Sequence, residues 1–383
     1  MTKKKLAIIG ASYLQEPLIR KAKEKNIETH VFAWKCGDIG EEIADYFYPI
    51  SIVEKDEILD KCKEIEIDGI CSIASDLAAI TVCYVASKMG LTGNSMESCA
   101  LSTNKFNMRK AFFANNDPSP KSELVTIEDI KCANFKYPVI IKPLDRSGSR
   151  GITLANNADE LMQGVEKAIE VGFEKKALVE EYVDGDEYSV ECVSYEGKHS
   201  FLAITQKYTT GAPNYIETGH IEPPVILNTT VENVKRVVFH ALDSLKIEYG
   251  ASHSEIKIDS NGHIKLIEIG ARMGGDFIGS DLVELSTGYD FVDAVIDISL
   301  GKRPLLPQGD DVDTSNYAAV HFIFSKEDVE MYHDLVKDDR YNVIQSDIPV
   351  SMDGEITDSS NRKGYYIYTC ASDCDVTKYM PRS

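Results

Sequence analysis

The stretch Lys265-Leu-Ile-Glu268-Ile-Gly270-Ala-Arg272-Met-Gly274-Gly275 is the most informative part of this chain. An apolar run with strand character delivers a carboxylate, an arginine follows four residues later, and a pair of glycines closes the stretch. Glu255 lies thirteen residues before Glu268, in a second alternating run that precedes the turn Asp259-Ser-Asn-Gly262. Two strands joined by such a turn pair antiparallel, so we expect both carboxylates on one face of a sheet.

Neighbouring carboxylates repel each other unless something positive lies between them. A divalent cation meets this need, and an all-oxygen pair of ligands suits magnesium that is also bound by phosphates. The pattern around Glu255 and Glu268 therefore predicts a magnesium site.

Composition limits the classes of protein that this chain can belong to. With 383 residues the chain can bury large cores, and we expect two or three domains. A net charge of -21 argues against nucleic acid or an anionic membrane as partner. No apolar run approaches the ~20 residues that span a bilayer, and the apolar run at the N-terminus is too short for a signal peptide. The nine cysteines are scattered without a zinc-type pattern, which indicates free thiols and a cytoplasmic location.

The first hundred residues alternate short apolar runs with helical patterns. We expect strands at 6–9, 29–33 and 69–73 and helices at 15–25, 57–65 and 76–89. Such alternation is typical of βαβ units around a parallel sheet. A nucleotide cofactor such as NAD is one alternative for this region. However, Gly10-Ala-Ser-Tyr-Leu-Gln lacks the G-x-G-x-x-G spacing, which favours a structural or substrate-docking role.

A lysine on a buried strand is followed by a loop of small residues in Tyr137-Pro-Val-Ile-Ile-Lys142-Pro-Leu-Asp-Arg-Ser147-Gly148-Ser149-Arg-Gly151. Glycines let backbone N–H groups approach an anion, serines add hydroxyl donors, and lysine adds positive charge. A phosphate-binding loop and a surface hairpin with a solvated lysine both fit this stretch, because small-residue loops are common.

An acidic connector lies between two strand-like runs in Ala177-Leu-Val-Glu180-Glu181-Tyr182-Val183-Asp-Gly-Asp-Glu187-Tyr-Ser-Val-Glu191. Its backbone and carboxylates could contact an adenine ring and a ribose. A charged hairpin turn is the alternative, because charge runs are usually solvated.

Taken in order, these motifs resemble the ATP-grasp superfamily over roughly residues 1 to 305. Lys105 precedes the Lys142 strand and its small-residue loop; the acidic connector, Glu255 and the Glu268–Arg272 stretch follow. The resemblance implies an α/β and α+β fold with three parts. These are a parallel-sheet βαβ domain at 1–101, a two-lobed ATP-grasp domain at 102–305 with a lid-bearing subdomain at roughly 120–185, and a small β-rich C-terminal lobe at 306–383.

The resemblance also assigns roles to individual residues. Lys105 and Lys142 correspond to lysines on the phosphate side of ATP, and Arg272 corresponds to the arginine that stabilises the transferred phosphoryl group. Glu255 and Glu268 correspond to the magnesium ligands. The remaining ATP-binding residues are implied by position alone: Ser147, Gly148 and Ser149 in the lid, Glu180, Glu181 and Val183 beside adenine, and Glu187 on the ribose.

One position departs from the pattern of the superfamily. Many relatives read Glu-x-Asn at the last metal strand, whereas this chain reads Glu268-Ile-Gly270. Glycine has no side-chain oxygen, so a second magnesium ion must use water, phosphate or another residue.

The implied activity is an ATP- and magnesium-dependent carboxylate–amine ligase, with manganese as a substitute metal. It would join a small carboxylate to an amine, such as two amino acids, and the superfamily suggests a homodimer. His220, in Glu217-Thr-Gly-His220-Ile-Glu-Pro-Pro224, and the backbone of Gly274 and Gly275 are the candidates for substrate binding. Two alternatives are a purine-pathway ligase or carboxylase and a nucleotide-binding regulatory protein without turnover.

Overall fold

In the computed structural model, residues 3–131, 135–146, 150–212, 215–307 and 316–381 are described. The N-terminal part contains a parallel sheet in the order β3-β2-β1-β4. Its strands are β1 (Lys5–Ile9), β2 (Glu28–Phe32), β3 (Tyr46–Tyr48) and β4 (Gly69–Cys71). The helices are α1 (Glu16–Glu24), α2 (Ile39–Ile43), α3 (Lys55–Ile65) and α4 (Asp76–Met89).

Both faces of this sheet are covered, which explains why β1 is apolar from Leu6 to Ile9. Leu6 and Ile8 pack into one cluster with residues of α1 and α10 (Phe291–Ser299). Ala7 and Ile9 point to the other face, where α3 and α4 pack. The predicted βαβ units are confirmed. The short elements α2 and β3 were not predicted, because three to five residues carry too little periodicity.

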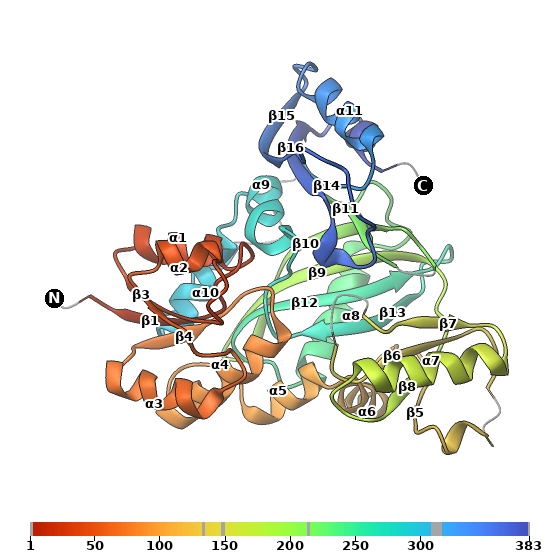
Figure 1. Ribbon diagram of the computed structural model, residues 1–383, viewed down its shortest axis with the longest axis horizontal. Coiled ribbons are helices and arrows are strands. Elements are labelled where there is room, and N and C mark those ends of the chain that lie inside the picture. Colours follow the sequence, from red (N-terminus) through yellow and green to blue (C-terminus); the bar gives the residue numbers. More distant parts are fainter. Residues whose placement is uncertain (1–2, 132–134, 147–149, 213–214, 308–315, 382–383) are drawn as a thin grey trace.

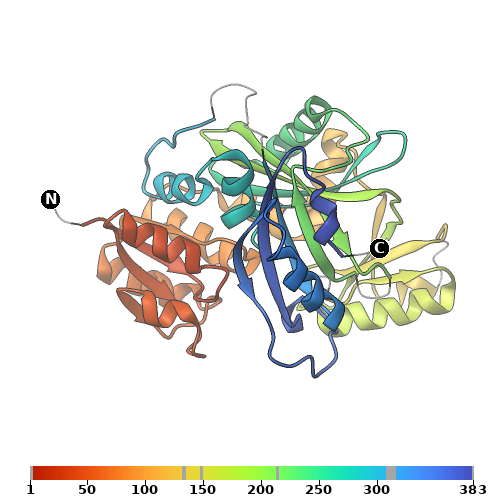
Figure 2. The same ribbon diagram turned by 90° about the horizontal axis from the view of Figure 1, so that it is seen from above.

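An eight-stranded sheet forms the centre of the molecule, in the order β13-β12-β9-β10-β11-β14-β16-β15 (Figures 1 and 2). The middle of the chain supplies five strands: β9 (Asp186–Tyr195), β10 (Lys198–Thr209), β11 (Glu217–Glu222), β12 (Gly250–Ile258) and, at one edge, β13 (Ile264–Gly270). The C-terminal part adds β14 (Asn316–Ile323), β15 (Tyr341–Asp347) and β16 (Gly364–Ala371), together with α11 (Lys326–Leu335). Pairing of β14 with β11 joins the C-terminal strands to the same sheet.

The two faces of the central sheet differ in polarity. One face packs Tyr188, Val190 and Ile256 into an apolar cluster with α6 (Lys105–Asn115) and α8 (Val231–Ser244). The other face carries acids, histidines and a lysine at the alternate positions of the same strands. Period-two alternation therefore places a charged surface inside the protein.

A smaller antiparallel sheet, in the order β5-β8-β6-β7, lies at the opposite end of the molecule from the N-terminal sheet (Figures 1 and 2). Its strands are β5 (Ser122–Val125), β6 (Val139–Pro143), β7 (Thr153–Ala155) and β8 (Ala177–Glu181). Helix α7 (Ala158–Val171) covers one face. The remaining helices are α5 (Met96–Thr103) and α9 (Val283–Thr287).

These sheets confirm the predicted fold class, a parallel βαβ region followed by antiparallel sheets and a β-rich C-terminal part. The domain boundaries at 101 and 305 stay predictions. The cysteines in the described part of the chain are free thiols. No helix within the described ranges has the length and apolarity needed to cross a membrane.

Candidate active site

A pocket lies between the charged face of the central sheet and the smaller sheet, and α4 and α6 contribute one residue each. Nine of the predicted site residues line it: Lys105, Lys142, Glu180, Glu181, Val183, Glu187, Glu255, Glu268 and Arg272. Residues that are up to 167 positions apart in the chain therefore line one pocket.

Glu255 and Glu268 lie directly opposite each other on the antiparallel strands β12 and β13. The turn at 259–262 joins these strands through a hydrogen bond from the Gly262 N–H to the Asp259 carbonyl oxygen. This pairing confirms the predicted hairpin and the common face of the two carboxylates.

Each of these carboxylates contacts a lysine. Nζ of Lys105 lies 2.6 Å from Oε1 of Glu268, and Nζ of Lys207 lies 2.6 Å from Oε1 of Glu255. Burial raises the pKa of the Glu255 carboxyl, but the positive charge of Lys207 lowers it. The pKa of Glu255 is therefore held well below 4.5. The Glu255 carboxylate is therefore ionised at neutral pH and available to a cation.

The chemistry of this pair fits a divalent cation. The two carboxylates offer oxygen donors across one strand pair, which suits magnesium when phosphates and water complete the shell. Among the residues that the structure describes, no cluster of three or more acidic, histidine or cysteine side chains is arranged to hold a metal. Glu255 and Glu268 would supply two oxygen ligands to such a cation, and Gly270 has no side-chain oxygen to add.

Glu180 is buried and forms ion pairs with two cations. Its Oε2 lies 3.0 Å from Nζ of Lys142, and the Arg109 guanidinium reaches Oε1 at 2.5 Å. Burial alone would raise the pKa of Glu180, but these cations lower it to about 2. The carboxylate thus positions Lys142 at the pocket wall. The predicted contact between Glu180 and adenine did not include these ion pairs.

The predicted ribose residue, Glu187, is the second residue of β9, and its Oε1 lies 3.2 Å from Nζ of Lys207. Lys207 has a third acidic neighbour, Glu217, at 3.8 Å. Burial lowers the pKa of Lys207, but the carboxylates of Glu255, Glu187 and Glu217 raise it well above 10.5. Lys207 is consequently a fixed positive charge at the floor of the pocket.

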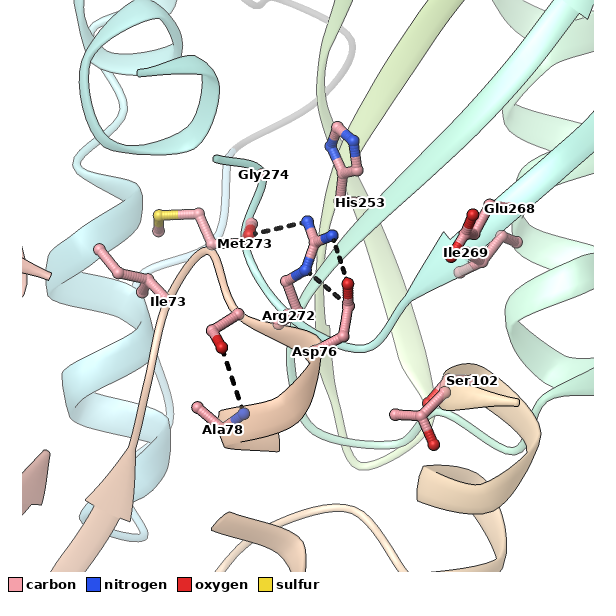
Figure 3. A network of polar contacts seen from close by, with 12 residues as sticks. Ile73, Asp76, Ala78, Ser102, His253, Glu268, Ile269, Arg272, Met273 and Gly274 are labelled. Atoms are coloured by element: carbon pink, nitrogen blue, oxygen red, sulfur yellow. Dashed lines mark hydrogen bonds and ion pairs between the residues drawn. The ribbon is translucent and has the colours of Figure 1, made fainter. Parts of the chain in front are cut away.

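Arg272 follows β13 and reaches toward the N-terminal part of the chain (Figure 3). Its Nε and Nη2 donate to the two carboxylate oxygens of Asp76 at 2.8 and 3.1 Å. Its Nη1 donates to the Met273 carbonyl oxygen at 3.2 Å. Asp76 is the first residue of α4, so this contact joins the N-terminal part to the pocket.

His253 lies two residues before Glu255 in β12, on the same face of the strand. Its Nδ1 contacts the buried carboxylate of Glu191, and its Nε2 lies 3.6 Å from Oε1 of Glu255. Burial lowers the pKa of His253, but Glu191 raises it to about 9. The N–H of Gly274 donates to the other oxygen of Glu191 at 3.0 Å, so this amide already has a partner.

The predicted acceptor residue His220 is on β11, opposite Lys207. It is 1% exposed, and neither ring nitrogen has a hydrogen-bond partner among the described residues. Its Nε2 lies 4.0 Å from Oδ2 of Asp276, and burial lowers its pKa. Asp276 in turn accepts two hydrogen bonds from Arg362, at 2.6 and 2.9 Å.

The remaining predicted residues fall into two groups. His220, Gly274 and Gly275 do not line the pocket formed by the described residues. Ser147, Gly148 and Ser149 lie outside the described ranges. Arg146 and Arg150 line the pocket.

Several residues of the site were not predicted from the sequence. Lys207 could have been noticed, because it stands in the apolar strand Phe201-Leu-Ala-Ile-Thr-Gln-Lys207. Asp76 and Arg362 gave no signal. Asp76 is an ordinary acidic residue in the first turn of a helix, and Arg362 is far from every motif in the sequence.

Comparison with known proteins agrees with the motif order. Residues 135–281 match the family model described as the ATP-grasp domain. The chain therefore contains an ATP-grasp domain.

The chain is similar to alanine–anticapsin ligase of Bacillus subtilis, with 27% identity over 312 residues. The aligned part is 72% of this chain and 66% of the length of that relative. Among solved structures, an L-amino acid ligase from Bacillus licheniformis superposes with a TM-score of 0.80 at 21% identity, covering 97% of this chain and 95% of the other. Phosphoribosylglycinamide synthetase from Anaerococcus prevotii gives 0.76 at 20% identity, with the same coverage. These two superpositions show a common fold.

Proposed function

We propose that this protein is an ATP- and magnesium-dependent carboxylate–amine ligase that forms an amide or peptide bond and releases ADP and phosphate. One observation carries the proposal. The opposed carboxylates Glu255 and Glu268 share a pocket with Lys105, Lys142 and Arg272, in a chain with an ATP-grasp domain. Similarity to an amino-acid-joining ligase favours amino acids or small acids as substrates.

The proposed reaction has two steps. A carboxylate oxygen of the first substrate attacks the γ-phosphorus of ATP, which gives an acyl-phosphate and ADP. The neutral amine of the second substrate then attacks the acyl carbon, and inorganic phosphate leaves. Positioning and neutralisation of charge account for most of what phosphoryl transfer requires.

The residues of the pocket fit these tasks. Lys105, Lys142 and Lys207 supply positive charge, and their present carboxylate contacts hold them in place until phosphates arrive. A magnesium ion on Glu255 and Glu268 would neutralise phosphate charge. Burial lowers the pKa of His220, and this residue lies outside the pocket lining, so it takes no part in the proposed steps.

ADP release in a screen of substrate pairs tests this proposal. Amino-acid pairs should support release of ADP and phosphate, whereas purine-pathway intermediates should not. Lys142→Ala and Glu268→Ala should abolish the release, and the exposed matched controls Lys198→Ala and Glu248→Ala should retain it. If Lys142→Ala or Glu268→Ala kept wild-type turnover, the proposed site would be wrong. ATP binding without ADP formation in any mixture would favour a regulatory protein.

A further inference from the structure

Asp76 and Arg272 form a forked ion pair that spans two separate parts of the chain (Figure 3). Asp76 starts α4 directly after the N-cap residue Ser75, whose Oγ accepts from the Ala78 N–H at 3.2 Å. The cap fixes the direction of the first turn and thereby the place of the Asp76 carboxylate. Two parallel N–H···O bonds then fix the plane of the guanidinium.

Gly270 leaves the space that this pair occupies. A Cβ atom at position 270 would lie 2.9 Å from Oδ1 of Asp76 and 3.2 Å from Nε of Arg272. A side chain there would therefore push the carboxylate or the guanidinium out of place. Gly270 has no side-chain oxygen to offer a metal. The missing side chain also leaves room for the Asp76 carboxylate, which comes from another part of the chain.

Backbone contacts hold the two partners in register. The N–H of Ala74 donates to the Met273 carbonyl oxygen at 3.2 Å, and Nη1 of Arg272 donates to the same oxygen. Burial raises the pKa of Asp76, but Arg272 holds it below 3.8, so the carboxylate is ionised at neutral pH. Both side chains line the pocket, where they are 20% and 16% exposed.

We propose that Asp76 is a positioning residue for Arg272, and that glycine at position 270 makes room for this pair. The inference rests on the proposed function, in which Arg272 stabilises the transferred phosphoryl group. An arginine side chain loses considerable rotamer freedom when it is ordered, and a preformed carboxylate fork orders it before ATP binds. The guanidinium then meets the developing charge without reorganising.

A double-mutant cycle tests the proposal. Asp76→Asn should lower kcat for ADP release by about tenfold or more, with KM for ATP within about twofold, because only an interaction made in the transition state is lost. In the Arg272→Lys background, Asp76→Asn should have little further effect on kcat. Asp76→Glu should restore part of the rate, and the exposed control Asp60→Asn should match wild type.

Gly270→Ala should lower kcat in the same way, because the new methyl group displaces the fork. In the Asp76→Ala background, where the carboxylate is gone, Gly270→Ala should have little additional effect. Equal losses from Gly270→Ala in both backgrounds would overturn the role of Gly270.

A second measurement separates this proposal from the ligase assignment. Wild type should bind ADP with aluminium fluoride, a mimic of the transferred phosphoryl group, more tightly than ADP alone, and Asp76→Asn should remove this difference. If wild type shows the difference but joins no substrate pair, the ligase proposal fails while the positioning role stands. If Asp76→Asn lowers Tm and its effect adds fully to Arg272→Lys, Asp76 only ties segments together and the inference is wrong.

Discussion

Two arginine–aspartate pairs hold the loop after β13, and they are built with opposite polarity. At Arg272 the loop supplies the cation, and the N-terminal part supplies the carboxylate of Asp76. At Asp276 the loop supplies the carboxylate, and the C-terminal part supplies the cation of Arg362. The N-terminal and the C-terminal part of the chain therefore each form one ion pair with the same loop.

The surroundings of the two pairs differ. Arg272 lines the pocket, whereas Arg362 stacks over the Phe322 ring at 3.6 Å and donates to the Glu217 carbonyl oxygen at 3.4 Å. Asp276 has a φ of 51°, which is uncommon for a residue with a side chain. The second pair thus supports a loop conformation that the local sequence does not favour, while the first directs a cation at the pocket.

The largest expected difference between the pairs is in turnover. Arg272→Ala should lower kcat for ADP release by roughly 10³-fold, because the transferred phosphoryl group loses a charge partner. Arg362→Ala should cost far less, since Arg362 acts on the loop and not on the phosphates. Steady-state kinetics of both variants beside the exposed control Arg303→Ala would measure this. Equal losses at 272 and 362 would remove the distinction drawn between the two pairs.

The buried carboxylate of Glu180, with its two cationic partners, shows what burial adds to such contacts. Glu180→Gln would leave Arg109 and Lys142 without their counter-charge, at a site where Glu180 is 2% exposed. The free energy of unfolding should fall by about 3 kcal/mol, because an uncompensated buried charge is costly. Urea unfolding of this variant and of the exposed β5 control Glu123→Gln would test it. A change as small as that of the control would mean that Lys142 is not held by Glu180.

The Arg362–Asp276 pair should have a smaller and pH-dependent effect on stability. Burial raises the pKa of Asp276, but Arg362 holds it well below 3.8. Its contribution is therefore present above the ordinary carboxyl pKa and is lost as the pH falls toward the depressed value. Asp276→Asn should cost about 2 kcal/mol near neutral pH and progressively less in acid. Unfolding curves over acid to neutral pH, with Asp339→Asn as the exposed control, would show a constant difference if the pair were not ionic.

The opposite pH dependence is expected at Glu222, a carboxyl of β11 that has no arginine partner among the described residues. Glu222 accepts hydrogen bonds from Thr205 and Ser286, and burial raises its pKa from 4.5 to about 8. Folding is therefore coupled to uptake of a proton by Glu222 when the pH lies between 4.5 and about 8. The stability that the protonated Glu222 contributes is lost as the pH rises through this range. Glu222→Gln should become more stable relative to wild type between about pH 5 and about pH 9. Parallel thermal unfolding curves at the two pH values would contradict this.

Local patterns predicted a large share of the fold and of the site. Alternation around Glu255 and Glu268, with a turn of Asp and Gly between them, was sufficient to predict the hairpin and its shared face. The βαβ order predicted the N-terminal parallel sheet for a similar reason, since its signals lie within a few residues of each other.

Contacts between distant segments could not be predicted in this way. Nothing near Asp76 indicates that its carboxylate meets Arg272, 196 positions later. The pairing of β14 with β11, which joins the C-terminal strands to the central sheet, has no local signal either. Strand partners far apart in the chain are chosen by packing and by the hydrogen bonds of the whole sheet.

Periodicity and the order of motifs were sufficient to predict the class of fold, the opposed carboxylates, the lysine on β6 and the arginine after β13. The partners that balance the charges of these residues became visible in the folded chain alone. Lys105 meets Glu268, Lys142 meets Glu180 and Arg272 meets Asp76, and each partner comes from another element. The physical reason is that burying a charge requires a counter-charge within a few ångströms, and the completed fold alone brings distant segments that close.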